Sequence, residues 1–189
     1  MIHSTAPVTA ADFEELLREG ERWLDLASGR LVRLEPPDEL HGNVVYNLAK
    51  AIAAHLRRNS EVLACFDVGL HLRRGPDTIH CPAISCFQTP GRFGEVEKLV
   101  TDTPPSLVVE VGSTPDRRES LSDRLADYRA AGVPAIWVVD TVTRHVHQHL
   151  PEGLPRMLKP QDTLTGEPVL PGFAMPVAQL FADPPWVGR

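Results

Sequence analysis

The stretch SLVVEVGSTPDRRESLSDRLADYRAAGVPAIWVVD, residues 106–140, carries the strongest structural pattern of this 189-residue chain. Residues 106–112 and 135–140 are compact apolar runs, which are typical of buried strands. A helical pattern over residues 119–131 lies between them. A strand, a crossover helix and a second strand predict a βαβ unit, with a parallel strand pair inside a mixed sheet.

The helix of this unit is densely charged. Asp116 and Glu119 are a predicted capping box at its start, and Gly132 is its predicted stop. Four basic side chains share this helix and alternate with acids; they are Arg117, Arg118, Arg124 and Arg129, with Glu119, Asp123 and Asp127 between them. Arg117 and Arg124, with Arg118 close to them, fall near one face of the helix. The pattern fits a phosphate-binding edge and an ion-paired helix in solvent equally well, and both stay open.

The rest of the chain divides into short elements. An amphipathic helix begins at Thr9, and residues 22–35 read as a hairpin turning at Ser28-Gly29. We further expect a long helix over residues 38–59, three or four strands over 61–87, a polar connection over 88–105 and a hairpin strand over 144–150. These elements predict one α/β domain, residues 1–189, with a core of about 9–150 and a loop-rich C-terminal extension, 151–189.

Composition limits the classes of protein. An apolar content of 42% supports one sizeable core, and a net charge of −6 argues against a passive DNA binder with a basic face. A metal-dependent nuclease stays open, because carboxylates that hold metal ions add negative charge. Three cysteines without a CxxC spacing read as small core residues. The first residues lack a signal-peptide pattern and no run could span a bilayer, so we expect a cytoplasmic protein without a membrane partner.

Glu110 is the most informative residue of the chain, because it interrupts the apolar run Leu107–Val111. A lone carboxylate among aliphatic side chains is costly unless a partner or a metal compensates its charge. One interpretation is a solvent-facing or arginine-paired glutamate. The other, which we favour, is a residue of a functional site, since valines on both sides suggest that both faces of the strand are covered.

The motif VVEVGSTPD, followed by SDRLADYRAAGVPAIWVVD, resembles the Uma-two family of restriction endonucleases in the PD-(D/E)XK superfamily. Upstream, LDLASGRLVRLEPPDELHG resembles the family's Glu-Leu-x-x-Gly-x-Leu-Val segment and its later histidine. The similarity runs from about Asp12 to Phe181. It implies a restriction-endonuclease-like core, with a mixed central sheet flanked by helices, and descent from a metal-dependent DNA phosphodiesterase.

The resemblance also implies a site. The family uses a Pro-Asp pair, a glutamate on the next strand and a lysine, and two carboxylates of this kind hold Mg²⁺ against a scissile phosphate. Laid over this chain, the glutamate is Glu110, the Pro-Asp pair falls on Pro82-Ala83 and the lysine on Arg124. The hairpin acid is Asp25, a second tentative metal ligand, and the histidine is His41.

Two of these positions depart from the family. Ala83 offers no oxygen to a metal, and Arg124 stays protonated, so it cannot act as a base. We therefore predict a degenerate site that binds Mg²⁺ poorly, with Arg124 paired to Glu110. A non-enzymatic nucleic-acid- or protein-binding module on the same fold is one alternative. An active endonuclease with a relocated acid is another; Asp25 is the candidate, while Asp77 reads as a turn residue.

Histidines raise two further questions. His41 is either a phosphate contact or support for a metal ligand near the site, or a helix-start residue bonded to the backbone. His145, His147 and His149 alternate along one strand face, and we expect an exposed polar face there rather than a transition-metal site. DNA is the partner that the resemblance implies, and a homodimer stays open.

Overall fold

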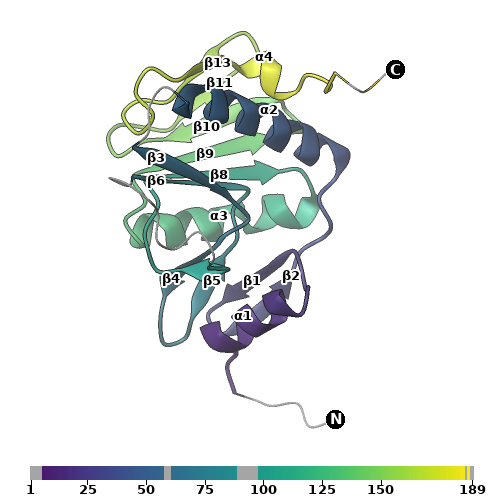
Figure 1. Cartoon of the computed structure of the whole chain (residues 1–189), viewed down its shortest axis with the longest axis vertical. Coiled ribbons are helices and arrows are strands. Elements are labelled where there is room, and N and C mark those ends of the chain that lie inside the picture. Colours follow the sequence, from purple (N-terminus) through teal and green to yellow (C-terminus); the bar gives the residue numbers. More distant parts are fainter. Residues whose placement is uncertain (1–5, 58–60, 89–97, 186, 188–189) are drawn as a thin grey trace.

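The computed structural model describes residues 6–57, 61–88, 98–185 and 187. The two larger β-sheets stand one above the other in Figure 1, with helices packed against them, and a third, two-stranded sheet is formed near the C-terminus. The helices are α1 Ala10–Arg18, α2 Glu39–Leu56, α3 Pro115–Ala130 and α4 Val177–Leu180. The strands are β1 Leu24–Ala27, β2 Arg30–Arg33, β3 Val62–Phe66, β4 Gly69–Arg73, β5 Thr78–His80, β6 Ile84–Gln88, β7 Val100–Thr101, β8 Leu107–Gly112, β9 Ala135–Asp140, β10 His145–His149, β11 Arg156–Leu158, β12 Thr163–Thr165 and β13 Ala174–Pro176.

The larger sheet contains the predicted βαβ unit. Its strand order is β11-β10-β9-β8-β6-β3, with β8 and β9 parallel and the other pairs antiparallel. Helix α2 covers one face and α3 the other (Figure 1). Side chains alternate accordingly: Val109 and Trp137 pack on the α2 side, whereas Val108 and Ile136 pack with Tyr128 of α3. The predicted parallel pair and mixed sheet are confirmed.

The N-terminal hairpin belongs to a second sheet, and the sequence had predicted the hairpin without assigning it a partner strand. Strands β1 and β2 turn at Ser28-Gly29, where both residues have positive φ as a type I′ turn requires. β1 then pairs with β5 through Leu26 and Ile79, and the order becomes β2-β1-β5-β4-β7. Phe13 of α1 closes the small core behind this sheet. In Figure 1 this second sheet lies on the side of α3 that faces away from the main sheet.

Helix α3 starts earlier than expected, and the predicted capping box is wrong. Pro115 occupies the first helical turn and Thr114 is the N-cap, so Asp116 already lies inside the helix. The Asp116 carboxylate accepts hydrogen bonds from the Thr114 hydroxyl, the backbone N–H of Arg117 and the backbone N–H of Glu35. Its role is to tie the loop before α2 to the start of α3.

The C-terminal segment belongs to the main core rather than to an extension beside it. Its apolar residues pack in one cluster with α2 and the main sheet; they are Leu164, Val169, Leu170, Phe173, Met175, Val177, Leu180 and Phe181. β11 also lengthens the main sheet at its edge. The hydrophobic core therefore continues past residue 150, where the sequence had suggested that it ends.

Within the described ranges, no helix is both long and apolar enough to cross a membrane. The cysteines are free thiols: Cys86 is buried, and Cys65 and Cys81 are partly buried. Half of the predicted connection over 88–105, residues 89–97, lies outside the described residues, and its later part contains the short strand β7.

Candidate active site

Glu110 lies in the middle of β8, an interior strand, and only 6% of its surface is exposed. Its neighbours Val109 and Val111 belong to the core on the α2 side. Because successive side chains alternate, Glu110 points to the face that α3 covers. The predicted burial of this carboxylate is confirmed, and its compensation must come from α3 or from the second sheet.

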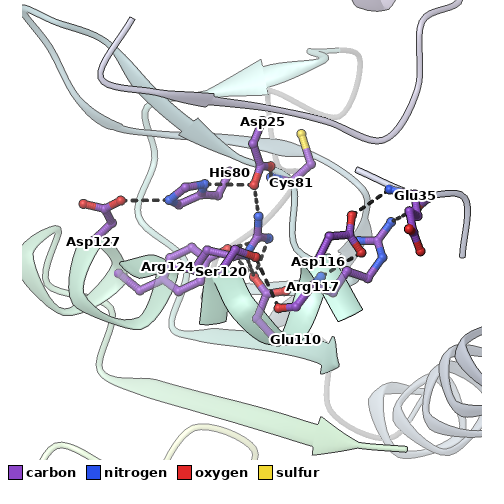
Figure 2. A network of polar contacts seen from close by, with 11 residues as sticks. Asp25, Glu35, His80, Cys81, Glu110, Asp116, Arg117, Ser120, Arg124 and Asp127 are labelled. Carbon is purple, nitrogen blue, oxygen red and sulfur yellow. Dashed lines mark hydrogen bonds and ion pairs between the residues drawn. The ribbon is translucent and has the colours of Figure 1, made fainter. Parts of the chain in front are cut away.

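Arg124 of α3 provides that compensation. Its Nε and Nη2 donate to Glu110 Oε1 at 2.9 and 2.6 Å, and its Nη1 donates to Asp25 Oδ2 (Figure 2). All three side chains are buried, and Asp25 comes from β1 of the second sheet. The predicted ion pair with Glu110 is confirmed. The guanidinium thus lies between the two carboxylates that the resemblance assigned to a metal.

Tyr128, one helical turn after Arg124, completes the shell around Glu110. Its hydroxyl donates to Glu110 Oε1 at 2.5 Å and accepts from Arg124 Nη2 at 3.2 Å. Burial raises the pKa of Tyr128 well above its usual value, so the hydroxyl keeps its proton and remains a donor. Tyr128 lies in the stretch that resembles the family, but only the structure shows that its hydroxyl contacts Glu110.

The other side of Asp25 is held by His80 and Cys81. His80 Nδ1 lies 3.1 Å from Asp25 Oδ2, and the backbone N–H of Cys81 donates to Oδ1 at 3.1 Å. His80 Nε2 lies 2.9 Å from Asp127 Oδ2, so the imidazole bridges β1 and α3 (Figure 2). Sequence reasoning missed His80 and Asp127. Their only sequence signal is that His80 precedes Pro82-Ala83 by two residues.

The network fixes the charges of its members. Burial raises the pKa of Asp25, but the charge of Arg124 and the hydrogen bond from His80 lower it more, so the net pKa lies below the usual value. Burial lowers the pKa of Arg124, and the charges of Asp25 and Glu110 outweigh this and raise it well above the usual value. The centre is therefore an ion cluster with a permanent cation inside it.

A cavity of about 340 Å³ opens beside this cluster. Glu110 and Ala83 both line it, as predicted. Each lies one residue beyond the antiparallel pair of Val109 with Ile84, so the two positions are adjacent across the sheet. The other polar or charged side chains around the cavity are Arg22, His41, Tyr46, Asp67, Cys81 and Arg117.

His41 lies in the first turn of α2 and faces the cavity, so the structure brings it to the site. Its backbone N–H donates to Asp38, the N-cap of the helix, and its Nδ1 lies 3.1 Å from Ser113 Oγ. Burial and then the charge of Arg117 lower the pKa of His41 to about 4. The imidazole is therefore neutral at pH 7 and can donate or accept one hydrogen bond in the cavity.

The residues present fit Mg²⁺ poorly. Among the described residues, no group of three or more His, Cys, Asp or Glu side chains is placed to hold a metal ion. Ala83 supplies no oxygen, both oxygens of Asp25 are engaged, and Arg124 puts a positive charge beside Glu110. Asp67, at the end of β3, is an acid in the cavity that sequence reasoning missed, because nothing in its local pattern marks it.

The remaining candidates lie away from the cavity. Asp77 is in the β4–β5 turn, as predicted, and accepts from the backbone N–H of Ala10. His145, His147 and His149 share one face of β10 but are half-buried rather than exposed. His149 contacts Arg129 at 2.7 Å. The exposed polar face expected there is therefore only partly correct, because neighbouring side chains cover it.

The basic residues of α3 do not form one surface. Arg118 donates to the backbone oxygen of Ser113, Arg117 to that of Glu35, and Arg124 to the buried acids. Each of these three contacts reaches a group outside the helix. Neither alternative from the sequence, a phosphate-binding edge or an ion-paired face in solvent, describes all of these arginines, because three of them bind groups elsewhere in the protein.

Comparison with known proteins places this architecture. The family model described as "Uma2: Putative restriction endonuclease" matches residues 10–178. A solved structure, described as a putative nuclease belonging to DUF820 from Anabaena variabilis ATCC 29413, superposes with a TM-score of 0.73 at 16% identity, covering 93% of this chain and 98% of that chain. A search of curated proteins gave no match. The nuclease-like fold and the sequence motifs agree, and the chain belongs to the Uma2 family of restriction-endonuclease-like proteins.

Proposed function

We propose that this chain is a restriction-endonuclease-like protein, descended from a metal-dependent DNA phosphodiesterase, whose catalytic centre is degenerate. The observation that carries this proposal is the position of Arg124, which pairs with Glu110 and Asp25 at once. In this reading the guanidinium compensates the carboxylates that a metal ion would otherwise compensate. The protein then keeps the fold for binding nucleic acid and has lost most of its capacity to cleave it.

Electrostatics supports the proposal. A divalent cation about 4 Å from a guanidinium would meet roughly 4 kcal/mol of repulsion per unit of its charge at an effective dielectric constant of about 20. Moving Arg124 away would leave its buried carboxylate partners unpaired until the metal arrived. Ala83 has no side-chain oxygen to bind the metal, so no additional metal ligand would offset the free energy lost when Arg124 moves.

A second candidate function, an active endonuclease with a relocated acid, is favoured by Asp67. This residue lines the same cavity as Glu110. Burial raises its pKa, while the charges of Arg117 and Arg22 lower it and that of Glu110 raises it, with a net increase. Two carboxylates near one cavity could share a metal ion if Arg124 moved. Asp67 therefore replaces Asp25 as the acid to test.

A plasmid-nicking assay with Mg²⁺ or Mn²⁺ separates the two functions. We expect the wild-type protein to nick no faster than its Glu110→Ala variant. Ala83→Asp combined with Arg124→Lys restores two carboxylates and an ammonium, and this double variant should gain metal-dependent nicking that Glu110→Ala abolishes. Nicking by the wild type that is lost in both Glu110→Ala and Asp67→Asn would overturn the proposal and establish the relocated acid.

A further inference from the structure

A tryptophan at the mouth of the cavity is both exposed to solvent and held in an unfavourable backbone conformation. Trp23 lines the cavity, yet 47% of its surface is exposed. Its backbone has φ 55, a left-handed conformation that is a real outlier for a bulky side chain. Asp67, which is far from Trp23 in the sequence, lines the same cavity and also has a positive φ, 51. Strained backbone that persists at a cavity points to a selected functional role.

Two arginines accompany this ring. Arg22 donates to the backbone oxygens of Leu17 and Glu21, which are uncharged acceptors. Arg117 donates from Nη2 to the backbone oxygen of Glu35 at 3.2 Å, and its buried Nε has no hydrogen-bond partner among the described residues. A guanidinium with a buried, unused donor at a cavity is suited to a phosphate oxygen.

The remaining lining limits the kind of ligand. Leu24, Leu34 and Val45 give the cavity apolar walls, and its volume of about 340 Å³ is that of a small-molecule site. A base inside a duplex has its faces covered by neighbouring bases, so only an unpaired base could lie flat on an exposed ring. Asp67 repels phosphate but accepts well from the amino group of a base such as cytosine.

We propose that Trp23 is a stacking platform for one unpaired base of single-stranded DNA, with Arg22 and Arg117 holding the adjacent phosphate. The inference rests on the proposed function only in taking nucleic acid as the ligand. Stacking needs neither a metal ion nor cleavage, so it would hold for a degenerate and for an active centre alike. Trp23 is then a specificity residue for single strands.

Fluorescence anisotropy with end-labelled oligonucleotides tests this in EDTA. The probes are oligo(dC), an abasic strand of the same length and the corresponding duplex. We expect oligo(dC) to bind tightest. Trp23→Ala should weaken its binding about ten-fold or more and leave the abasic strand unaffected, while Trp23→Phe retains most of the affinity. Trp23→Gly suits the positive φ, so it should fold at least as stably as the wild type and still lose the oligo(dC) preference.

Controls on the same chain separate stacking from general effects. Met157→Ala removes an equally exposed apolar side chain at the far edge of the main sheet and should change nothing. Arg117→Ala should weaken oligo(dC) and abasic strand together and reduce the salt dependence, unlike Arg129→Ala on the same helix.

The outcomes distinguish the two proposals. Equal affinity for oligo(dC), abasic strand and duplex, or an unchanged preference in folded Trp23→Gly, would overturn the stacking role. So would the absence of any oligonucleotide binding, which would favour a protein partner for the exposed ring. Cleavage of the strand on adding Mg²⁺ would contradict the proposed function and leave the stacking role intact.

Discussion

Arg124 reaches carboxylates on two different sheets from one helix, and its removal tests how much they depend on it. Arg124→Ala would leave Glu110 and Asp25 buried without their main cation. We expect the free energy of unfolding to fall by about 3–5 kcal/mol, measured by urea denaturation at pH 7. Protonation of the orphaned acids would limit the loss and make it smaller at low pH.

The matched control is Arg129→Ala, which removes the same charge from an exposed position of α3 and should cost less than about 0.5 kcal/mol. If both variants lost the same small amount, the buried ion cluster would not stabilise the fold, and compensation of Glu110 would have to be sought elsewhere.

His41 makes stability depend on pH in a defined window. Its pKa is about 4 in the folded protein against 6.5 for the free side chain. Between these values the unfolded chain binds a proton that the folded chain does not, so stability falls as the pH falls through this window. Between pH 7 and pH 5, we expect the wild type to lose about 1–2 kcal/mol more unfolding free energy than His41→Gln. Parallel losses in urea denaturation would show that His41 titrates normally.

Sequence reasoning found some site residues and missed others for a physical reason. Glu110 was visible because a carboxylate inside an apolar strand is unusual, and Ala83 and Arg124 were visible because a motif assigned their positions. His80, Asp127 and Asp67 carry no such signal. These residues matter because they contact residues that are distant in the sequence, as His80 contacts Asp25. No local sequence pattern indicates such a contact.

At the scale of elements, the β8–α3–β9 unit was predictable because its apolar periods and its glycine stop are local. The start of α3 was not, because Pro115 and Thr114 set it two residues earlier than the predicted capping box at Asp116 and Glu119 suggested. The hairpin itself was predicted from alternation and its turn, but not its sheet. Pairing of Leu26 with Ile79 is a long-range contact, and alternation does not specify a partner strand.

The turn at Ser28-Gly29 follows β1, the strand that bears Asp25. We expect this turn to tolerate no side chain at Gly29. Gly29 has φ 74, and an added Cβ would lie 2.6 Å from Cβ of Pro7. Gly29→Ala should therefore lower the unfolding free energy by about 1–3 kcal/mol in thermal or urea denaturation. Gly42→Ala, within α2 and with no atom within 4 Å of its Cβ, should instead stabilise by up to about 1 kcal/mol. Equal effects would mean that the turn can relax.

At the scale of the whole molecule, two sheets meet around α3, and the candidate site lies where they meet. Asp25 comes from the second sheet and Glu110 from the main sheet, with Arg124 between them. The C-terminal segment packs on the opposite side of the main sheet with α2 (Figure 1). Its prolines suggested loops, and it does contain loops, but its spaced apolar residues complete the core; proline content alone could not reveal that.

Calorimetric titration of the wild-type protein with Mg²⁺ and Mn²⁺ shows whether Arg124 takes the place of a metal ion at this junction. We expect no saturable binding by the wild type, and we expect binding to appear in the Ala83→Asp, Arg124→Lys double variant. Stoichiometric binding by the wild type that Glu110→Ala abolishes would show instead that the guanidinium does not replace a metal ion.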